Sequence, residues 1–345
     1  MNIAHLIFSL NTGGTETMLV DILNRQSESH SVALFIINDQ VNEGLLQQIS
    51  GKVKVVRLNR KEGARNPMPL LRLNRALWRF DPEVIHCHNH KAVNMLRLSL
   101  RKKALLTLHT TNVPVTNLKK YAKLFAISRA VQTDVHNRSG LSTQVIYNGV
   151  DFDAVVEKKG PADPAVFRIV QVGRLDHEVK GQHILLEALK ILKEQGHNHI
   201  RLDFIGEGVS TLHLVQLRAA LGLDDVVRFL GARDRKYIYQ HLQDYNLLVQ
   251  PSFVEGFGLT IVEAIAAGLH VLVSDLDGPM EIIRAAQRGD YFKTGDSRSL
   301  AGSINAILER KVETTIPPAA KLYVRQNFDI AHTVNHYLNA YKTLK

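Results

Sequence analysis

The strongest constraint on the fold of this chain is a rhythm of short apolar segments separated by stretches long enough to form helices. In the first half the apolar segments are "NIAHLIFSL", "SVALFII", "EVIHCH" and "ALLTLH"; in the second they are "FRIVQVG", "RLDFIG", "VVRFLG", "YNLLVQPS" and "HVLVSD". Strands that alternate with helical spacers pair in parallel, because a crossover between parallel strands needs a dozen or more residues. The pattern therefore predicts an α/β fold with two doubly wound parallel sheets.

A charged segment with two prolines separates the two series. This segment, "EKKGPADPAVF" at residues 157–167, has the composition of a linker. We expect one domain over residues 1–160, a second over residues 161–325, and a final helical segment at residues 326–345. Two domains also suit the length of 345 residues, which exceeds the size at which one hydrophobic core stops growing.

Charge is distributed unevenly between these two halves. Residues 1–160 hold 22 Lys and Arg against 12 Asp and Glu, whereas residues 161–345 hold 21 of each, so the net charge of +10 arises in the first half. A basic half suits nucleic acid, an anionic membrane or an anionic small substrate. The single Cys87 excludes an internal disulfide and a multi-thiolate metal site. With no secretion signal in "MNIAHLIFSL" and no bilayer-length apolar stretch, we expect a cytoplasmic enzyme.

Four polar segments follow predicted strands, where open parallel sheets bind ligands. They are "NTGGTE" (11–16), "LHTTN" (108–112), "GRLDHEVKG" (173–181) and "SFVEGFGLTIVE" (252–263). Arg174 and Lys180 flank a turn, and the amides near residues 256–259 open a helix, which favours an anion. Together these features predict a diphosphate site. Neither the dinucleotide fingerprint nor the phosphate loop ending in Gly-Lys-Ser/Thr is present, which disfavours a dehydrogenase or an ATPase.

Nearly the whole chain resembles the family-4 retaining glycosyltransferases of the GT-B architecture, of the bacterial glycan-assembly type. The resemblance implies two Rossmann-like domains facing across a cleft, with the C-terminal helix returning to the first domain. The first domain would bind the acceptor and the second a nucleotide sugar such as a UDP-sugar. The matching pieces, in family order, are "GGTE", "VIHCHN", "TLHTT", "AISRAV", "VIYNGVD", "VGRLDHEVKGQHILLEAL", "FIGEG", "VRFLG" and "PSFVEGFGLTIVEAIAAGLHVLVSD".

The resemblance also assigns roles to individual residues. Arg174 and Lys180 would stabilise the leaving diphosphate, Glu255 would lie near the sugar hydroxyls, and His109 would face the reactive carbon. Glu263 would accept hydrogen bonds from the ribose. The family's Lys usually comes five residues after the Arg, whereas Lys180 comes six after Arg174. The remaining expected donor contacts are Gly13, Gly14, Glu207, Phe229, Leu230, Gly256, Phe257, Gly258 and Leu259.

Two motifs imitate metal sites, and for both we favour a structural role, so that neither a metal nor a cofactor is expected. "SDLDG" (274–278) resembles an Asp-x-Asp motif but follows a strand at a domain-core loop. "HCHNH" (86–90) would place His86, His88 and His90 on one face of a strand, as in a zinc cluster. Without a carboxylate or thiolate partner, such histidines more often line a site than bind metal.

These observations predict a metal-independent retaining hexosyltransferase that acts on a glycan or lipid-linked acceptor, in polysaccharide or lipopolysaccharide synthesis. Two alternatives stay open: a sugar-nucleotide 2-epimerase of the same architecture, and a basic nucleic-acid-binding module. The second lacks any recognition motif, so no nucleic-acid partner is expected. Leu70, Leu73 and Leu77 should pack against the sheet. A cationic surface that could dock on the inner face of an anionic membrane would contain Arg72, Arg75, Arg79, Lys102, Lys103, Lys119, Lys120 and Lys123.

Overall fold

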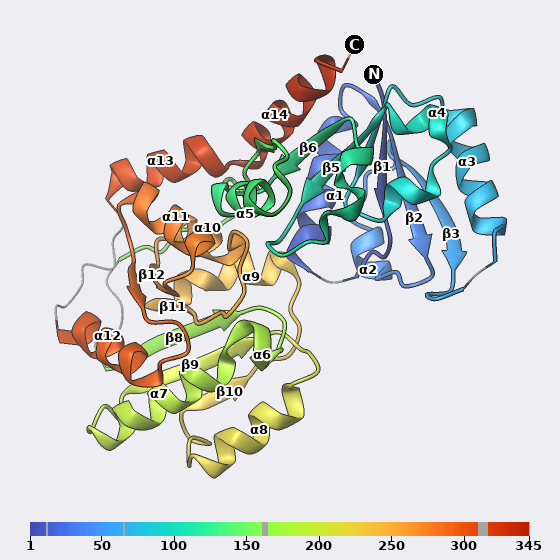
Figure 1. The fold of residues 1–345 in the computed structure, drawn as a ribbon. Helices are drawn as coiled ribbons and strands as arrows, with labels where there is room; N and C mark the ends of the chain where they lie inside the picture. The colour runs from blue at the N-terminus through green and yellow to red at the C-terminus, as the bar shows by residue number, and fades with distance from the viewer. Residues whose placement is uncertain (12, 65, 161–164, 310–316, 345) are drawn as a thin grey trace. The chain divides into compact units, whose positions relative to one another are not determined.

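The computed structural model describes residues 1–345 except 12, 65, 161–164, 310–316 and 345 (Figure 1). The chain forms two compact units: unit 1 is Met1–Gly149 with Ile330–Lys345, and unit 2 is Val150–Asp329. The sequence placed the divisions after residues 160 and 325, whereas the structure places them after Gly149 and Asp329. The reason is backbone pairing, because Val150 N donates to Phe328 O and Val150 forms a parallel bridge with Asp329.

Unit 1 is built on a seven-stranded sheet in the order β3-β2-β1-β4-β5-β6-β7, and every pairing in it is parallel. The chain leaves β1 toward one edge and then returns to β4 on the other side of β1, so the strand order reverses between these two strands. The strands are β1 (Asn2–Ile7), β2 (Ser31–Asn38), β3 (Lys54–Arg60), β4 (Val84–Cys87), β5 (Ala104–Leu108), β6 (Lys123–Ala126) and β7 (Gln144–Val145).

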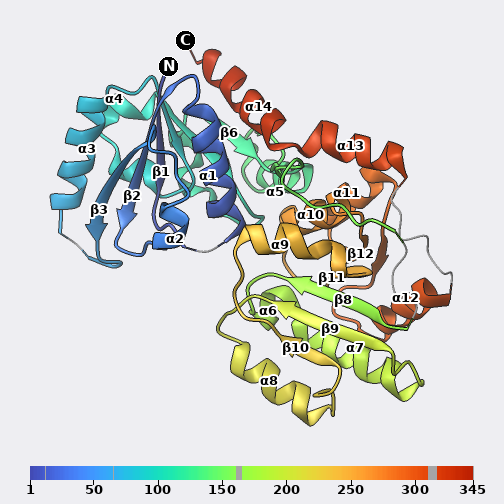
Figure 2. The same cartoon turned by 180° about the vertical axis from the view of Figure 1, so that it is seen from behind.

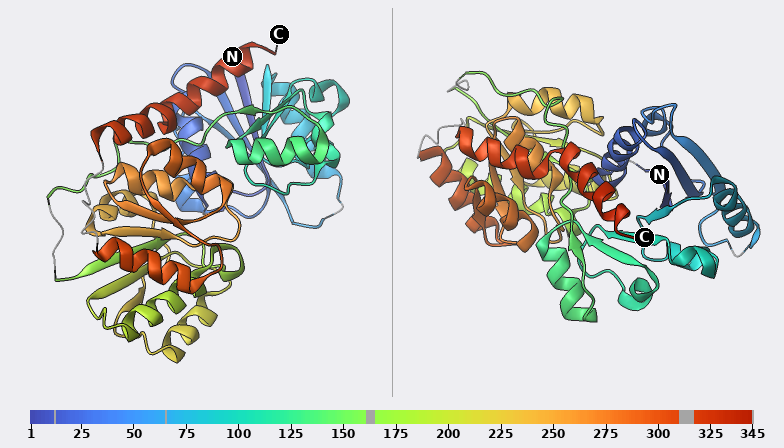
Figure 3. Two further views of the ribbon diagram at one scale, coloured as in Figure 1. Left: turned by 60° about the vertical axis from the view of Figure 1, so that its left-hand side comes forward. Right: turned by 90° about the horizontal axis from the view of Figure 1, so that it is seen from above.

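Helices cover both faces of the unit 1 sheet. Figure 3 shows α1 (Gly14–Gln26) and α14 (Ile330–Lys342) on one face and α3 (Met68–Phe80) on the opposite face. Leu73 and Leu77 of α3 are fully buried, which confirms the packing predicted from their spacing. The other helical segments are α2 (Glu43–Leu46), η1 (Ala92–Met95), α4 (Leu98–Arg101), η2 (Val115–Lys120) and α5 (Arg129–Ser139).

The last helix belongs to unit 1, as expected from the resemblance. Thr333 of α14 donates from its hydroxyl to the carbonyl of Tyr147. Tyr337 and Tyr341, one turn apart on the same helix, are almost completely buried in this unit. Burial of two large aromatic side chains contributes several kcal/mol, on the order of 1.5–3 each, which holds the end of the chain on the first sheet.

Unit 2 repeats the plan with six parallel strands in the order β10-β9-β8-β11-β12-β13. The prediction of two doubly wound parallel sheets is therefore confirmed. Here the order reverses between β8 and β11. The strands are β8 (Phe167–Val172), β9 (Ile200–Ile205), β10 (Val227–Phe229), β11 (Leu247–Gln250), β12 (His270–Ser274) and β13 (Asp290–Phe292).

Two helical layers enclose the unit 2 sheet. Figure 2 shows α7, α8 and α12 on one face and α10, α11 and α13 on the other. The first layer packs its leucines and isoleucines against inward-facing residues of β8, β9 and β11. The helical segments are α6 (His177–Lys180), α7 (Gln182–Glu194), α8 (Thr211–Ala220), α9 (Arg235–His241), η3 (Leu242–Asp244), α10 (Leu259–Ala266), α11 (Asp277–Ala286), α12 (Ser297–Glu309) and α13 (Pro318–Phe328).

Candidate functional site

The polar residues of unit 2 that the sequence singled out gather where its strand order reverses. β8 and β11 pair directly, with Leu247 opposite Ile169 and Leu248 opposite Val170. The loops that leave their carboxyl ends, residues 173–181 and 251–258, are therefore neighbours. Ligands of doubly wound sheets bind outside the carboxyl ends of the strands at this kind of switch point. This makes the two loops the candidate site of unit 2.

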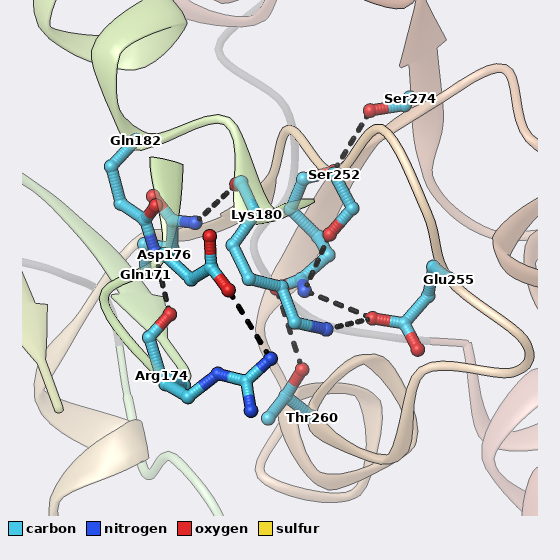
Figure 4. Close-up of polar contacts among 10 residues, drawn as sticks. Gln171, Arg174, Asp176, Lys180, Gln182, Ser252, Glu255, Thr260 and Ser274 are labelled. Atoms are coloured by element: carbon cyan, nitrogen blue, oxygen red, sulfur yellow. Dashed lines mark hydrogen bonds and ion pairs between the residues drawn. The ribbon is translucent and has the colours of Figure 1, made fainter. Parts of the chain in front are cut away.

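An ion pair joins the two loops. Lys180 Nζ lies 2.7 Å from Glu255 Oε2, and both side chains are largely buried, at 21% and 14% exposure. Figure 4 shows the two side chains pointing toward one another. Gln250 Nε2 also donates to the same carboxylate oxygen, at 3.2 Å. Gln171 of β8 donates to the carbonyl of Lys180, which fixes the end of α6. The site thus holds a cation and an anion at fixed positions.

Close backbone contact brings these loops together. Gly181, which follows Lys180, has a φ of +65°, and a Cβ added there would meet the carbonyl oxygen of Pro251 at 1.9 Å. Only glycine combines this left-handed conformation with so short an approach. The glycine in the "VKG" sequence therefore allows the loop after β8 to lie against the loop after β11.

Arg174 lies in the same loop but extends into solvent. Its side chain is 65% exposed and donates to Asp176 Oδ2 at 3.3 Å, while its carbonyl accepts a hydrogen bond from Gln182 Nε2. The backbone is thus anchored and the guanidinium is accessible. Because the ion pair with Asp176 is exposed, it contributes at most about 1 kcal/mol and an anionic ligand can replace it.

The N-terminus of α10 faces the same region through backbone rather than side chains. Gly258 caps the helix with a φ of +106°, a conformation that residues with a Cβ rarely adopt. Phe257 is 1% exposed and its ring packs against Phe328, so it can offer a ligand only its peptide groups. The first amides of a helix have no acceptor within the helix, and the helix dipole favours an anion there. Gly256 and Leu259 flank this turn.

The other expected donor contacts in unit 2 lie on neighbouring strands or inside α10. Glu263 is on α10 and is 7% exposed. Glu207 follows β9, and its carboxylate accepts from Ala232 N at 3.3 Å. Phe229 ends β10 and stacks on Phe204, and Leu230 follows it and donates its N–H to Phe204 O. Glu207, Phe229 and Leu230 therefore lie at the carboxyl ends of β9 and β10, the same end of the sheet as the loop that carries Lys180.

Asp275 in "SDLDG" has a local structural task. Its carboxylate accepts hydrogen bonds from both the backbone N–H and the hydroxyl of Thr294, and these bonds lower its pKa. They tie the loop after β12 to the segment after β13. This contact agrees with the structural role that we favoured for the motif.

In unit 1, histidines gather at the corresponding strand ends. His109 follows β5, His88 follows β4, and His5 lies in β1 opposite His86 of β4. Nitrogen atoms of His5, His86 and His88 lie within 4.8 Å of one another. The strand ends at Cys87, so the alternation does not extend to His90, which is absent from this group of three. The predicted trio of His86, His88 and His90 is therefore wrong in its last member.

Burial keeps these rings neutral. It lowers the pKa of His5 and of His109 to about 4, and it lowers that of His86 and His88 well below the ordinary value. Gly13 and Gly14 stand at the start of α1 in the same unit, after β1. His109 and these glycines therefore belong to one unit, whereas Arg174, Lys180 and Glu255 belong to the other.

Sequence reasoning missed several residues that shape these two regions. Gln250 contacts Glu255 and Ser252, and its signal was a polar residue ending the apolar strand "YNLLVQ". Gln26, Tyr337 and Tyr341 surround the histidines, and nothing in their local sequence marks them. Only the folded chain joins His86 to Tyr341, which lies 255 positions away.

Comparisons with known proteins show which family the chain resembles. Residues 12–154 match the family described as "Glycosyltransferase Family 4", and residues 155–321 match "Glycosyl transferases group 1". The chain is 28% identical to phosphatidyl-myo-inositol mannosyltransferase of Mycobacterium leprae over 79% of this chain and 76% of that protein. It is 24% identical to lipopolysaccharide 1,6-galactosyltransferase of Escherichia coli over 93% and 94%.

Solved structures show the same fold. The crystal structure of Anabaena HepE in complex with UDP-glucose aligns over 99% of both chains, with a TM-score of 0.82 and 25% identity. The apo form of the lipopolysaccharide outer core galactosyltransferase WaaB aligns over 99% of this chain and 100% of that one, with a TM-score of 0.75 and 19% identity.

Proposed function

The chain belongs to the family-4-type glycosyltransferases of the GT-B architecture, and from this premise we propose that it transfers a hexose from a UDP-sugar with retention of the anomeric configuration. The acceptor that we propose is a lipid-linked or lipopolysaccharide glycan. Supporting this choice, relatives named above are a lipopolysaccharide galactosyltransferase and a phosphatidyl-myo-inositol mannosyltransferase.

The observation that carries the proposal is the arrangement of Arg174, Lys180 and the α10 N-terminus at the switch point of unit 2. Two cations and a set of helix amides suit a diphosphate, whose negative charge grows as the sugar leaves. Preformed donors that meet this growing charge stabilise the transition state more than the ground state. Because these groups already supply positive charge, we propose that transfer requires no metal ion.

Glu255 and Glu263 would hold the two ends of the donor. A carboxylate accepts hydrogen bonds and has no donor of its own, so it suits hydroxyl-rich groups. Glu255 lies at the mouth of the site beside Lys180 and would take the sugar hydroxyls. Glu263 lies deeper, on α10, and would take the ribose hydroxyls. Glu207, Phe229 and Leu230 would then border the base or the ribose.

For the chemical step we propose direct front-side displacement. The bond between C1 of the sugar and the phosphate oxygen breaks while a bond from C1 to the acceptor oxygen forms, and the leaving phosphate oxygen takes the acceptor proton. His109, whose pKa burial lowers to about 4, is neutral at pH 7 and would orient the sugar as a hydrogen-bonding group. This assignment requires no nucleophilic carboxylate.

Release of UDP tests the proposal. UDP-glucose, UDP-galactose and other nucleotide sugars are first ranked by the rise in unfolding temperature that they cause, because ligands of the folded state raise apparent stability. The best donor is then incubated with and without lipid-linked or lipopolysaccharide-core acceptors. We expect UDP only when an acceptor is present, and a retained anomeric configuration in the product by NMR. Interconversion of sugar nucleotides without an acceptor would instead support the epimerase.

We also propose that unit 1 docks on an anionic membrane surface through the exposed face of α3. Leu71 and Trp78 are 54% and 74% exposed, and Arg72, Arg75 and Arg79 lie on the same side of the helix. An apolar stripe flanked by arginines suits an interface with anionic lipid. Within the part of the chain that the structure describes, no helix has the length and apolar character to cross a bilayer.

Some of the lysines that the sequence grouped with these arginines have other contacts. Lys103 is bonded to Pro82 O and lies 3.8 Å from Asp81, and Lys120 donates to Asn94 and Asn117. Trp78 is the single tryptophan, so its fluorescence reports on α3 directly. We expect a blue shift with anionic vesicles and none with neutral vesicles. Equal responses to both would remove the electrostatic argument.

A further inference from the structure

Gln26 and three histidines of unit 1 form a continuous chain of side-chain hydrogen bonds. Gln26 Oε1 lies 2.8 Å from His5 Nε2, and His5 Nδ1 lies 3.1 Å from His88 Nε2. His88 Nδ1 in turn lies 3.2 Å from His109 Nε2. These residues come from the end of α1, from β1, and from the loops after β4 and β5. The chain therefore connects a buried residue at the far end of α1 to His109.

The first member of the chain fixes the direction of every bond in it. The structure places the amide oxygen of Gln26, and not its amide nitrogen, beside His5 Nε2, and an amide oxygen only accepts, so His5 Nε2 carries the proton that it donates to Gln26. A neutral imidazole has one N–H, so His5 Nδ1 is an acceptor and His88 Nε2 must be the donor. By the same step His88 Nδ1 accepts, and His109 Nε2 donates. His109 is thus left with its lone pair at Nδ1.

The donor and acceptor roles in this chain require that each histidine ring is neutral. His5 and Gln26 are completely buried, and burial lowers the pKa of His5, His88 and His109. A protonated ring would donate from both nitrogens and break the sequence of donor and acceptor. His109 Nδ1 is buried and has no hydrogen-bond partner among the described residues. It is the one nitrogen of the three rings whose bonding capacity the described part of the protein leaves unused.

We propose that Gln26, His5 and His88 are positioning residues that hold His109 in a single tautomer, with a lone pair and no proton at Nδ1. The role of His109 rests on the proposed function. The setting of its tautomer rests only on the contacts within unit 1. Any group that hydrogen-bonds to Nδ1 must therefore be a donor, such as a sugar hydroxyl, because a nitrogen that carries only a lone pair cannot bind a carbonyl or phosphate oxygen.

The same contacts argue against reading the histidines as a metal centre. Both nitrogens of His86 are engaged, with Tyr341 Oη at 2.6 Å and Thr107 Oγ1 at 2.7 Å. The two nitrogens of His5 and of His88 are engaged in the chain itself. A metal ion would have to replace several buried hydrogen bonds, each of which leaves an unsatisfied partner when broken. Ring contacts between His86 and Tyr337 complete the packing.

Nitrogen NMR of the full-length protein tests the tautomer without any substrate. In protein labelled with ¹⁵N-histidine at pH 7.5, long-range ¹H–¹⁵N correlations distinguish a protonated ring nitrogen from one with a lone pair. The His109 signals are assigned by their loss in His109→Asn. We expect a protonated Nε2 and an unprotonated Nδ1. A protonated Nδ1 in the wild type overturns the inference, whether or not the protein proves to be a glycosyltransferase.

A matched pair of variants tests the role of Gln26. Gln132→Met removes a glutamine that is hydrogen-bonded to the Thr143 carbonyl elsewhere in unit 1, so as the control it should leave the His109 tautomer unchanged. Gln26→Met keeps the length but removes the acceptor, so His109 should become a mixture of tautomers. An unchanged His109 spectrum in Gln26→Met would refute the proposal. Should that variant fail to fold, His5→Phe, which removes the acceptor for His88, should give the same mixture of tautomers, and an unchanged spectrum would count equally against it.

Kinetics give a second readout. In Gln26→Met we expect kcat to fall in proportion to the fraction of His109 in the competent tautomer, while KM for the donor is unchanged. Gln132→Met should keep the kcat of the wild type. A variant that merely loosens the fold would change the melting temperature without this pattern. Active enzyme with unchanged kcat in Gln26→Met and the expected NMR spectra would show that the tautomer is set but not used, which contradicts the positioning role.

Discussion

The candidate regions of the two units occupy equivalent places in similar sheets but differ in charge. Each lies where the strand order reverses, between β8 and β11 in unit 2 and between β1 and β4 in unit 1. In unit 2 the defining contact is an ion pair, Lys180 with Glu255, beside an exposed Arg174. In unit 1 it is a set of buried histidines whose pKa values are lowered.

This difference indicates two kinds of task. Arg174, whose side chain is exposed, can exchange Asp176 for an anionic ligand at small cost, because exposed pairs contribute little to stability. Buried neutral rings carry no charge to exchange, but they orient hydrogen bonds in a fixed direction. The carboxyl ends of the strands can therefore carry charged groups that suit a diphosphate in one unit and neutral hydrogen-bonding groups in the other.

Removing the Lys180 side chain from the unit 2 site should have the largest effect on the rate of transfer. We expect Lys180→Ala to lower kcat by about 10²–10³, because a preformed donor to the leaving diphosphate is worth roughly 3–4 kcal/mol in the transition state. Arg174→Ala should behave similarly with no change in melting temperature, since its side chain is exposed. Initial rates of UDP release measure both.

A lysine in an ordinary surface pair is the control for this experiment. Lys190 pairs with Glu194 along α7, at 40% and 63% exposure, and has no contact with the candidate site. Lys190→Ala should leave kcat unchanged and alter stability by less than about 0.5 kcal/mol. Equal activity of Lys180→Ala and Lys190→Ala would show that the ion pair of unit 2 is structural, and the contrast between the two units would disappear.

Acid should affect unit 1 through its histidines. An unfolded histidine binds a proton below pH 6.5, whereas folded His5 and His109 do so only near pH 4. The unfolded state therefore binds more protons between these values, and stability falls as the pH falls. The free energy of unfolding should decrease by about 1.4 kcal/mol per pH unit for each such ring, reaching about 3 kcal/mol at pH 4.

This loss of stability is measured by urea unfolding at pH 7.5, 5.5 and 4.5. The unfolding is monitored by hydrogen exchange in peptides from β4 and β5. His5→Phe removes one buried ring and should make the pH dependence shallower. His136, which is exposed on α5, supplies the control, and His136→Gln should keep the slope of the wild type. A slope unchanged in His5→Phe would mean that His5 is already charged in the folded protein.

The sequence could predict the unit 2 region because each of its two segments is a continuous stretch of the chain. Lys180 and Glu255 lie in two short segments, and each segment carries its own turn and helix start, so local chemistry singled out both segments that the structure brings together. The histidine region could not be predicted in the same way. Its membership depends on the pairing of His5 with His86 across two strands, and the residue that directs the chain, Gln26, is an unremarkable glutamine at the end of a helix.

The structure also distinguishes buried from exposed residues of α3 where the sequence pattern could not. The leucine spacing of α3 identified Leu73 and Leu77 as core, but the same pattern did not reveal that Trp78 is exposed. The division between the units was misplaced because proline and charge suggested a linker at residues 157–167, whereas backbone bonds from Val150 set the actual boundary. Long-range pairing, which no local pattern encodes, accounts for the misplaced boundary.

Substitutions at two glycines test whether backbone geometry, as well as charge, defines the unit 2 site. Gly258 has a φ of +106°, and an added Cβ would meet Ile261 Cδ1 at 2.5 Å, so Gly258→Ala should destabilise unit 2 by about 1–2 kcal/mol and weaken donor binding. Gly302 lies inside α12 with open space around it, so Gly302→Ala should stabilise by roughly 0.5–1 kcal/mol. Thermal unfolding with and without UDP measures both.

Chelation should have the smallest effect of all, namely none on the rate. Positive charge for the diphosphate would come from Lys180, Arg174 and the α10 amides, so EDTA should leave UDP release unchanged. Loss of activity restored by magnesium or manganese would place a metal at the donor and remove the proposed role of these groups. If EDTA lowered the rate of UDP release, if only zinc restored it, and if EDTA had no effect on His88→Gln, the metal would instead be assigned to the histidines of unit 1. Because those rings are already hydrogen-bonded to Gln26, Thr107 and Tyr341, zinc binding would have to break contacts that the structure shows intact.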